Sequence, residues 1–382
     1  MLEKNIMTYM EKTQESRWKS ETSGKHNNGV EEFDKRWFCI AICHDGSIFM
    51  DDADTPVRFL EILQNAIIAW IDFRTRDFEK DARIAATQLG FSDQLTSSLL
   101  GEMHVLYEDM DTEVGMKLPS IQIRTYEHPD VQPHTTLLLL QKNFILTIHT
   151  LEVDRRFSRL RRYSNKILQR IPTEESPENK LTLLLLRIID QNNDRNFEHL
   201  RQIEEQGDEL NKKLMDTQTP RNILGPQIYG MKHALITYLD ALWVTIDVLH
   251  DIRYGDAELL TDEPKLLERV GLLAEDVNRQ IGLAEHMSEV LSSGLEVLQS
   301  IYNNQLQVMN NRMSLIITYL TIVGTAVLVP NTIATIFGVT AWELGHEDIG
   351  WYLAILFIST IIATGLVFWW VKKKGWIPQK MD

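Results

Sequence analysis

Two long uncharged segments near the end of the 382-residue chain constrain its fold more than any other feature. The first runs from Met313 to Trp342 and the second from Ile349 to Val371, and neither contains Asp, Glu, Lys or Arg. Each exceeds the roughly 18 apolar residues that mark a membrane-spanning helix. The sequence therefore predicts two such helices, preceded by a soluble region that takes up about four fifths of the chain.

The charges beside these segments predict their orientation. Arg312 precedes the first segment and three lysines at 372–374 follow the second, whereas the short connection carries Glu343, Glu347 and Asp348 without Lys or Arg. Because positively charged flanks stay on the cytoplasmic side, both termini are expected in the cytoplasm and the acidic connection outside. We expect a multi-pass protein of the cell membrane.

The soluble region begins with a mixed α/β pattern. Residues 37–43 and 47–50 flank Asp45-Gly46, which is typical of a hairpin. Ala66–Phe73 is predicted as a buried strand and Phe78–Phe91 as a helix. Residues 135–150 are expected to form two strands around Lys142-Asn143, where Asn suits a turn with an unusual backbone angle.

A long helix is predicted before and into the first uncharged segment. No proline occurs between Pro264 and Pro330, and apolar residues recur at three- and four-residue steps from Leu267 to Met313. A single helix over this stretch would be on the order of 100 Å long. We expect that such a helix does not bury its apolar stripe within its own domain, so the pattern predicts self-association.

Composition and motifs exclude several classes of function. The net charge of −15 argues against a nucleic-acid-binding surface. The sequence has no phosphate-binding glycine loop, nucleophile elbow or HExxH motif, so neither enzymatic activity nor a cofactor is expected. Cys39 and Cys43 are expected to be reduced thiols in a cytosolic domain. The acid-rich stretch 171–210 fits either a solvated helix face or a surface that concentrates cations.

The first uncharged segment carries small hydroxylated residues at helical spacing. They are Ser314, Thr318, Thr321, Thr325, Thr332 and Thr335. Such a stripe fits close helix packing, with each hydroxyl bonded to its own backbone, or the wall of a water-filled pore. Since two helices cannot enclose a pore alone, conduction would require several copies.

Two further features of this segment bear on ion binding. Pro330 removes a backbone hydrogen bond and frees a carbonyl near Ala326, and Gly338 allows the chain to open out. A backbone-rich segment of this kind suits an ion that keeps part of its hydration shell, as Mg²⁺ does. No His/Cys cluster with metal-ligand spacing occurs nearby, so no fixed first-shell metal site is predicted.

These pieces together resemble the CorA family of divalent-cation transporters over about residues 36–376. The stretch LTIVGTAVLVPNTIATIFGVT before an acidic loop resembles the first span and signature of that family, and the second span ending in KKKGW resembles its basic C-terminus. WIDF, LGF and LLLQKNFILTIHT resemble its cytoplasmic domain. The resemblance implies a funnel-shaped homopentamer in a lipid bilayer, a long stalk helix lining the pore, and passage of Mg²⁺, Co²⁺ or a related ion such as Ni²⁺.

The resemblance also implies a set of site residues. The Gly-Met-Asn selectivity filter of the family corresponds to Gly338, Val339 and Thr340, so only the glycine is kept. The zinc branch, ZntB, keeps the asparagine, and the chain fits neither pattern. The carried-over pore-lining residues are Ile317, Leu320, Gly324, Leu328, Asn331 and Thr335. The acidic residue of the interface metal sensor in many members is replaced here by Ser97 or Ser98, with Asp93 displaced nearby.

The leading prediction is a divalent metal cation transporter or channel, with Mg²⁺ as the first choice. Its alternatives are a zinc or other transition-metal transporter of the ZntB type and a non-conducting membrane-anchored sensor or scaffold. The acidic outer loop, with Glu343, Glu347 and Asp348 as cation-capture residues, favours transport, whereas the lost asparagine favours the scaffold.

The predicted domains are a disordered N-terminus (1–34), a cytoplasmic α/β and helical domain (35–262), a stalk helix (263–312), a first transmembrane helix (313–340), an external loop (341–348), a second transmembrane helix (349–371) and a basic cytoplasmic C-terminus (372–382).

Overall fold

The chain divides into two compact units, Met1–Gly294 and Leu295–Asp382. The computed structural model describes residues 36–101, 105–124, 130–172, 174–215, 220–255, 257–338 and 349–374. The predicted disordered N-terminus and basic C-terminus lie largely outside the described residues.

The first unit is built on a sheet of seven strands within the described residues. The strands are β1 (Trp37–Cys43), β2 (Ile48–Ala53), β3 (Ala66–Thr75), β4 (Tyr107–Asp109), β5 (Val114–Ile123), β6 (Val131–Gln141) and β7 (Phe144–Thr150). Their order is β2-β1-β3-β7-β6-β5-β4. β3 and β7 are parallel at the centre, and the other neighbours pair antiparallel.

Both predicted strand pairs are confirmed. β1 and β2 pair around Asp45-Gly46, and Gly46 has φ of +79°, a conformation that favours glycine. β6 and β7 meet at Lys142-Asn143, but the expected unusual backbone angle at Asn143 is wrong, because Asp111 is the one non-glycine residue with positive φ in the described ranges. Instead, the Asn143 side chain donates to the carbonyl oxygens of Leu63 and Ala66 at 2.7 and 3.1 Å.

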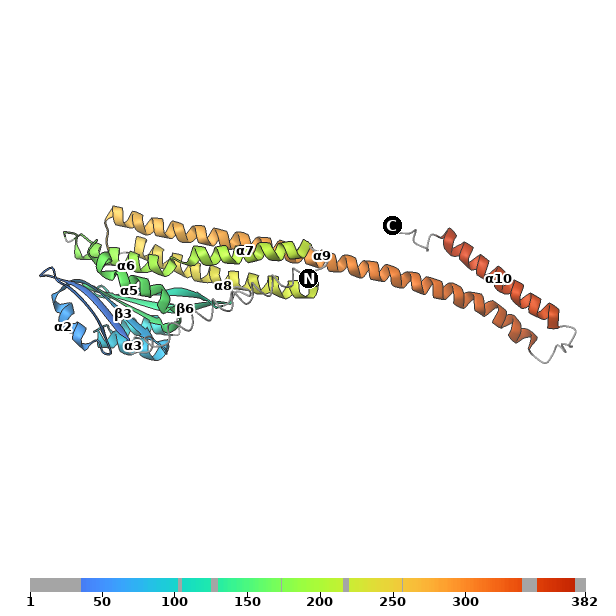
Figure 1. Cartoon of the computed structure of the whole chain (residues 1–382), viewed down its shortest axis with the longest axis horizontal. Coiled ribbons are helices and arrows are strands. Elements are labelled where there is room, and N and C mark those ends of the chain that lie inside the picture. Colours follow the sequence, from blue (N-terminus) through green and yellow to red (C-terminus); the bar gives the residue numbers. More distant parts are fainter. Residues whose placement is uncertain are drawn as a thin grey trace, which may run out of the picture. The chain divides into compact units, whose positions relative to one another are not determined.

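Helices cover both faces of the sheet, as Figure 1 shows. One face packs against α2 (Val57–Asn65), α3 (Phe78–Gln88) and α4 (Asp93–Leu100). Because side chains alternate along a strand, every second residue of β3, including Ile71 and Phe73, enters this apolar core. The hydrophobic effect of this burial fixes the sheet against α2, α3 and α4.

The opposite face carries a mostly helical layer. After the short 3₁₀ helix η1 (Leu151–Val153) come α5 (Asp154–Leu168), α6 (Pro177–Asn193), α7 (Asn196–Met215) and α8 (Arg221–Tyr254). α5, α6 and α8 contact the sheet, and α7 packs against α8. The acids of α7 lie on its exposed side and Leu200, Ile203 and Leu210 on its buried side, which is the arrangement of a solvated helix face.

The long helix α9 (Pro264–Phe337) is continuous, as predicted, and belongs to both units. The expectation that its apolar stripe stays unburied within the chain is wrong for the part in the first unit. There Val270, Val277, Ala284 and Leu291 are buried. A Cβ added at Gly207 of α7 would lie 3.6 Å from Met231 Sδ of α8 and 3.9 Å from a Leu291 methyl carbon, so these three helices pack closely. The argument for self-association therefore rests on the later part of α9.

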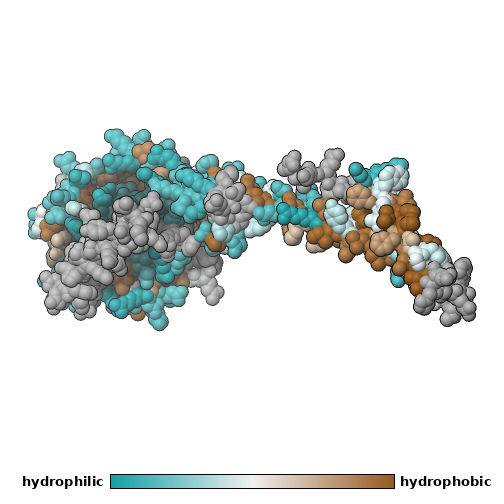
Figure 2. Space-filling model, turned by 45° about the vertical axis from the view of Figure 1, so that its right-hand side comes forward, coloured by the Kyte–Doolittle hydropathy of each residue, from teal (hydrophilic) through white to brown (hydrophobic). Residues whose placement is uncertain are grey.

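The second unit holds the rest of α9 and α10 (Ile349–Lys373). Both helices are long and apolar enough to cross a membrane. Pro330 lies within α9, as predicted. In Figure 2 hydrophobic surface gathers over this unit, whereas the visible face of the first unit is mostly hydrophilic. Surface of this composition is typical of a segment surrounded by lipid.

Candidate functional site

Within the second unit, α9 has one covered side. Ile322 and Ala326 are its buried residues there, each 6% exposed, and Thr318, Thr325 and Ile333 on the same side are half-buried. These residues mark the side of α9 that the rest of the chain covers in this unit.

The predicted pore-lining residues lie on the other side of α9. At 3.6 residues per turn they share an arc of about 80°, centred opposite Ile322 and Ala326. Ile317, Leu320 and Leu328 are 57%, 71% and 62% exposed, and a Cβ added at Gly324 would meet nothing within 4 Å. Asn331 and Thr335 are also exposed. The chain thus leaves this stripe uncovered, so that other copies could place it around a common axis.

The hydroxyl stripe is satisfied within the helix itself. Thr318, Thr321, Thr325, Thr332 and Thr335 each donate their hydroxyl to the carbonyl oxygen four residues earlier, at 2.8 Å in every case. Hydroxyls bonded to their own backbone are what the helix-packing interpretation of the stripe expected. The hydroxyl hydrogens are therefore occupied, and the oxygens keep a free lone pair as an acceptor.

Of the predicted filter and outer loop, Gly338 alone belongs to the described residues. α9 ends at Phe337, and the backbone N–H of Gly338 donates to the Ala334 carbonyl oxygen at 2.9 Å. A Cβ at Gly338 would lie 3.0 Å from that same oxygen, so a side chain is crowded there. Val339, Thr340, Glu343, Glu347 and Asp348 lie outside the described residues.

Ser97 or Ser98 is the residue predicted to replace the acid of the family's interface metal sensor. Ser98 donates its hydroxyl to a Glu108 carboxylate oxygen at 2.6 Å, and Asp93 opens α4. Within the described ranges, no group of three or more His, Cys, Asp or Glu side chains is placed to hold a metal ion. The Ser98–Glu108 contact joins α4 to β4 within one chain.

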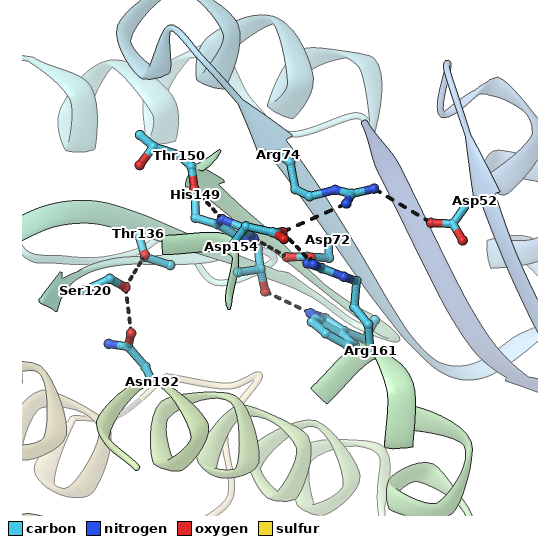
Figure 3. Close-up of polar contacts among 12 residues, drawn as sticks. Asp52, Asp72, Arg74, Ser120, Thr136, His149, Thr150, Asp154, Arg161 and Asn192 are labelled. Atoms are coloured by element: carbon cyan, nitrogen blue, oxygen red, sulfur yellow. Dashed lines mark hydrogen bonds and ion pairs between the residues drawn. The ribbon is translucent and has the colours of Figure 1, made fainter. Parts of the chain in front are cut away.

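The structure contains a buried ionic network that sequence reasoning missed (Figure 3). The Oδ1 atom of Asp72 lies 3.1 Å from Nε2 of His149, and both side chains are fully buried. The Arg161 guanidinium contacts Asp72 through one nitrogen and Asp154 through the other. Burial raises the pKa of Asp72, but attraction by His149 and Arg161 outweighs it and lowers the value to about 2.

Strand register explains how the network forms. In the parallel pair of β3 and β7, Asp72 is opposite Thr147, and His149 is the next β7 residue on the same face. Arg161 reaches this face from α5, and Trp70 Nε1 donates to Thr147 Oγ1 at 2.9 Å. The network fixes α5 to the sheet. Its sequence signal is an ionisable residue within each buried apolar strand, Asp72 in AIIAWIDF and His149 in FILTIHT.

A second buried polar group joins β5 and β6 to α6. The hydroxyls of Ser120 and Thr136 lie 2.6 Å apart, and Ser120 also donates to Asn192 Oδ1 at 2.6 Å (Figure 3). Arg156 of α5 bonds the carbonyl oxygens of Ile121 and Asn192. The two buried polar networks thus attach the helical layer to the sheet. None of their residues belongs to α9.

Comparison with known proteins agrees with this architecture. The pattern that defines CorA-like Mg²⁺ transporter proteins matches residues 65–373. No curated protein matches the chain.

Three solved structures share the fold. The complete CorA magnesium transporter from Methanocaldococcus jannaschii is 19% identical, with 90% of this chain and 99% of that chain covered and a TM-score of 0.60. The full-length CmaX protein is 14% identical, with the same coverage and a TM-score of 0.56. The ZntB cytoplasmic domain from Vibrio parahaemolyticus RIMD 2210633 is 13% identical over 71% of this chain and all of that chain, with a TM-score of 0.51. The predicted fold class, an α/β domain followed by a long helix and two C-terminal apolar spans, is confirmed.

Proposed function

The chain belongs to the family of CorA-like Mg²⁺ transporter proteins, and we propose that it carries a divalent cation, Mg²⁺ in the first place, across the cell membrane. One observation carries this proposal. The residues that correspond to the family's pore wall form a single stripe on α9 opposite the covered side marked by Ile322 and Ala326, and the chain leaves them uncovered. A stripe that only packed α9 against the rest of its own chain would lie on the covered side.

A pore requires several copies, because two helices cannot enclose one. We propose a homopentamer, as the family resemblance implies, assembled through the later part of α9 in a lipid bilayer. Leu306, Met309 and Met313 support assembly there, since each is exposed in the single chain although its position continues the apolar stripe. Both termini are proposed to lie in the cytoplasm, in accordance with the flanking positive charges.

Selectivity is assigned to Gly338, Val339 and Thr340. Five copies of Thr340 would present hydroxyls and backbone carbonyls, which suit an ion that retains part of its water. Rings of Leu320 and Leu328 would form apolar constrictions that stop ions by excluding water. The acids Glu343, Glu347 and Asp348 would concentrate cations at the outer mouth.

A zinc or other transition-metal transporter is the second candidate. The observation that favours it is the middle residue of the filter, where Val339 replaces the family's methionine, because the zinc branch also varies this residue. The replacement of the asparagine by Thr340 instead suits a non-conducting sensor or scaffold, for which no ion uptake is expected.

Uptake by the purified protein in liposomes tests the proposal. Mg²⁺, Co²⁺, Ni²⁺ and Zn²⁺ are compared at equal concentration with protein-free liposomes as the control. We expect protein-dependent Mg²⁺ uptake that increases with an inside-negative potential. Uptake of Zn²⁺ alone would establish the second candidate, and no uptake of any ion would establish the scaffold.

A further inference from the structure

A basic cleft lies in the first unit between the end of α5, the middle of α6 and the start of α9. Its volume is about 610 Å³, which is within the range of pockets that hold small organic ligands. Its lining includes Ile167 and Arg170, Leu183 and Arg187, and Lys265 and Arg269, one pair from each of these three segments. All of these residues belong to the first unit, and none of them is part of the proposed ion pathway.

The charge of this cleft is unusual for a protein with a net charge of −15. Of its four cationic side chains, Arg187 pairs with Asp190 at 2.7 Å. Arg170, Lys265 and Arg269 form no ion pair with any part of the chain that the structure describes. Like charges held around one cavity repel each other, so an anion bound between them would relieve that repulsion.

Within the described residues, the two acids of the cleft, Glu175 and Glu263, form no ion pair with these cations, so the lining keeps an excess of positive charge. Asn179 of α6 donates one side-chain N–H to Glu175 at 2.7 Å and the other to Glu263 at 2.8 Å. Thr261 in turn donates its hydroxyl to the Asn179 side-chain oxygen. Asn179 thus holds both carboxylates at one edge of the cleft, where they hydrogen-bond to an amide and not to the cations.

The remaining wall is apolar. Besides Ile167 and Leu183 it includes Ile171, Pro172 and Leu266. An apolar wall beside unpaired guanidinium groups suits a ligand with both a ring and a phosphate, because arginine binds phosphate with two parallel N–H donors. We propose that this cleft binds a phosphorylated organic anion of nucleotide size, with its phosphate groups on Arg170, Lys265 and Arg269.

Isothermal titration of the full-length protein in mild detergent tests this site. The probe is ADP without divalent cations, and adenosine and pyrophosphate are titrated separately. We expect ADP to bind at least about tenfold more tightly than either comparison compound, which corresponds to about 1.4 kcal/mol. The double variant Arg170→Gln/Arg269→Gln should weaken ADP binding at least about tenfold, and Lys265→Glu should act in the same direction.

The control is Arg201→Gln, which makes the same kind of substitution once, at an exposed α7 side chain paired with Glu205. It should leave ADP affinity unchanged, and thermal melts should show that all variants fold. No ADP binding at about 1 mM, equal loss in the control, or equal affinity for pyrophosphate and ADP would each overturn the proposal. Because no step involves ion passage, a failure of cation uptake leaves this test unaffected.

Discussion

The carboxylate of Asp72 and the imidazole of His149 approach to 3.1 Å at the centre of the sheet, where neither side chain is exposed to solvent. The parallel pairing of β3 with β7 brings them together, and Arg161 completes the charge balance from α5. A buried carboxylate is costly unless it is paired, so removal of one partner should destabilise the others.

Asp72→Asn should therefore lower the free energy of unfolding by about 3 to 5 kcal/mol, because it leaves Arg161 and His149 without their shared anion. Thermal unfolding of the detergent-solubilised protein measures the change. Asp194→Asn is the matched control, since its pair with Arg159 at 3.3 Å is half-exposed and should contribute less than about 1 kcal/mol. Equal effects of the two substitutions would show that the buried network has no special role.

His199 of α7 should make stability depend on mildly acidic pH. Burial, together with the positive charges of Arg156 and Arg195, lowers the pKa of His199 from 6.5 to about 4. Below about pH 6.5 the His199 imidazole binds a proton in the unfolded chain but stays neutral in the folded chain. The free energy of unfolding should therefore fall as the pH decreases from about 6.5 to about 4. Unfolding measured across this range should show a shallower slope in His199→Gln. The same slope in both proteins would assign the dependence to other groups, such as His134, whose pKa burial also lowers.

Leu328→Ala should raise passive ion leak through reconstituted protein without preventing assembly. A smaller side chain would widen the apolar constriction and let water enter it. Val329→Ala is the control, because it removes a similar volume about 100° further around the same helix. Ion leak from loaded liposomes measures the effect, and unchanged leak in Leu328→Ala would move the constriction to another position.

Neutralising the three acids of the outer loop should weaken the capture of Mg²⁺ at the pore mouth and leave its passage through the pore unchanged. In a pentamer Glu343, Glu347 and Asp348 would place about fifteen carboxylates at one mouth, a field that salt screens over about 8 Å. The triple variant to Gln, Gln and Asn should reduce uptake at micromolar Mg²⁺ far more than at millimolar Mg²⁺. Uptake that is unchanged at every concentration would identify these acids as an ordinary solvated loop.

Local patterns in the sequence predicted much of the fold. Asp45-Gly46 marked a hairpin, and strict apolar spacing marked α9. The same spacing did not show that α7 and α8 bury the first part of α9, because a periodic stripe does not identify the surface that covers it. The Asn143 side chain bonds Leu63 and Ala66, two residues distant in sequence, so a local turn argument gave the wrong role.

The candidate site was predictable only as a stripe. The family resemblance supplied Ile317, Leu320 and Leu328, and the structure shows that all three are exposed on one side of α9. The network of Asp72 and His149 depends on which strands are neighbours, and a single sequence does not give strand order. It was detectable only as isolated polar residues in two apolar strands.

Thiol modification on the stripe tests the central claim most directly. Gly324→Cys places a thiol in open space on the proposed pore side, and Val323→Cys places one on an exposed position about 100° away. Mg²⁺ uptake into proteoliposomes is measured before and after treatment with a bulky, charged thiol reagent, with untreated and wild-type protein as controls. The account predicts that the reagent stops uptake by Gly324→Cys and spares Val323→Cys and wild-type. Full modification of Gly324→Cys with undiminished Mg²⁺ uptake would contradict it.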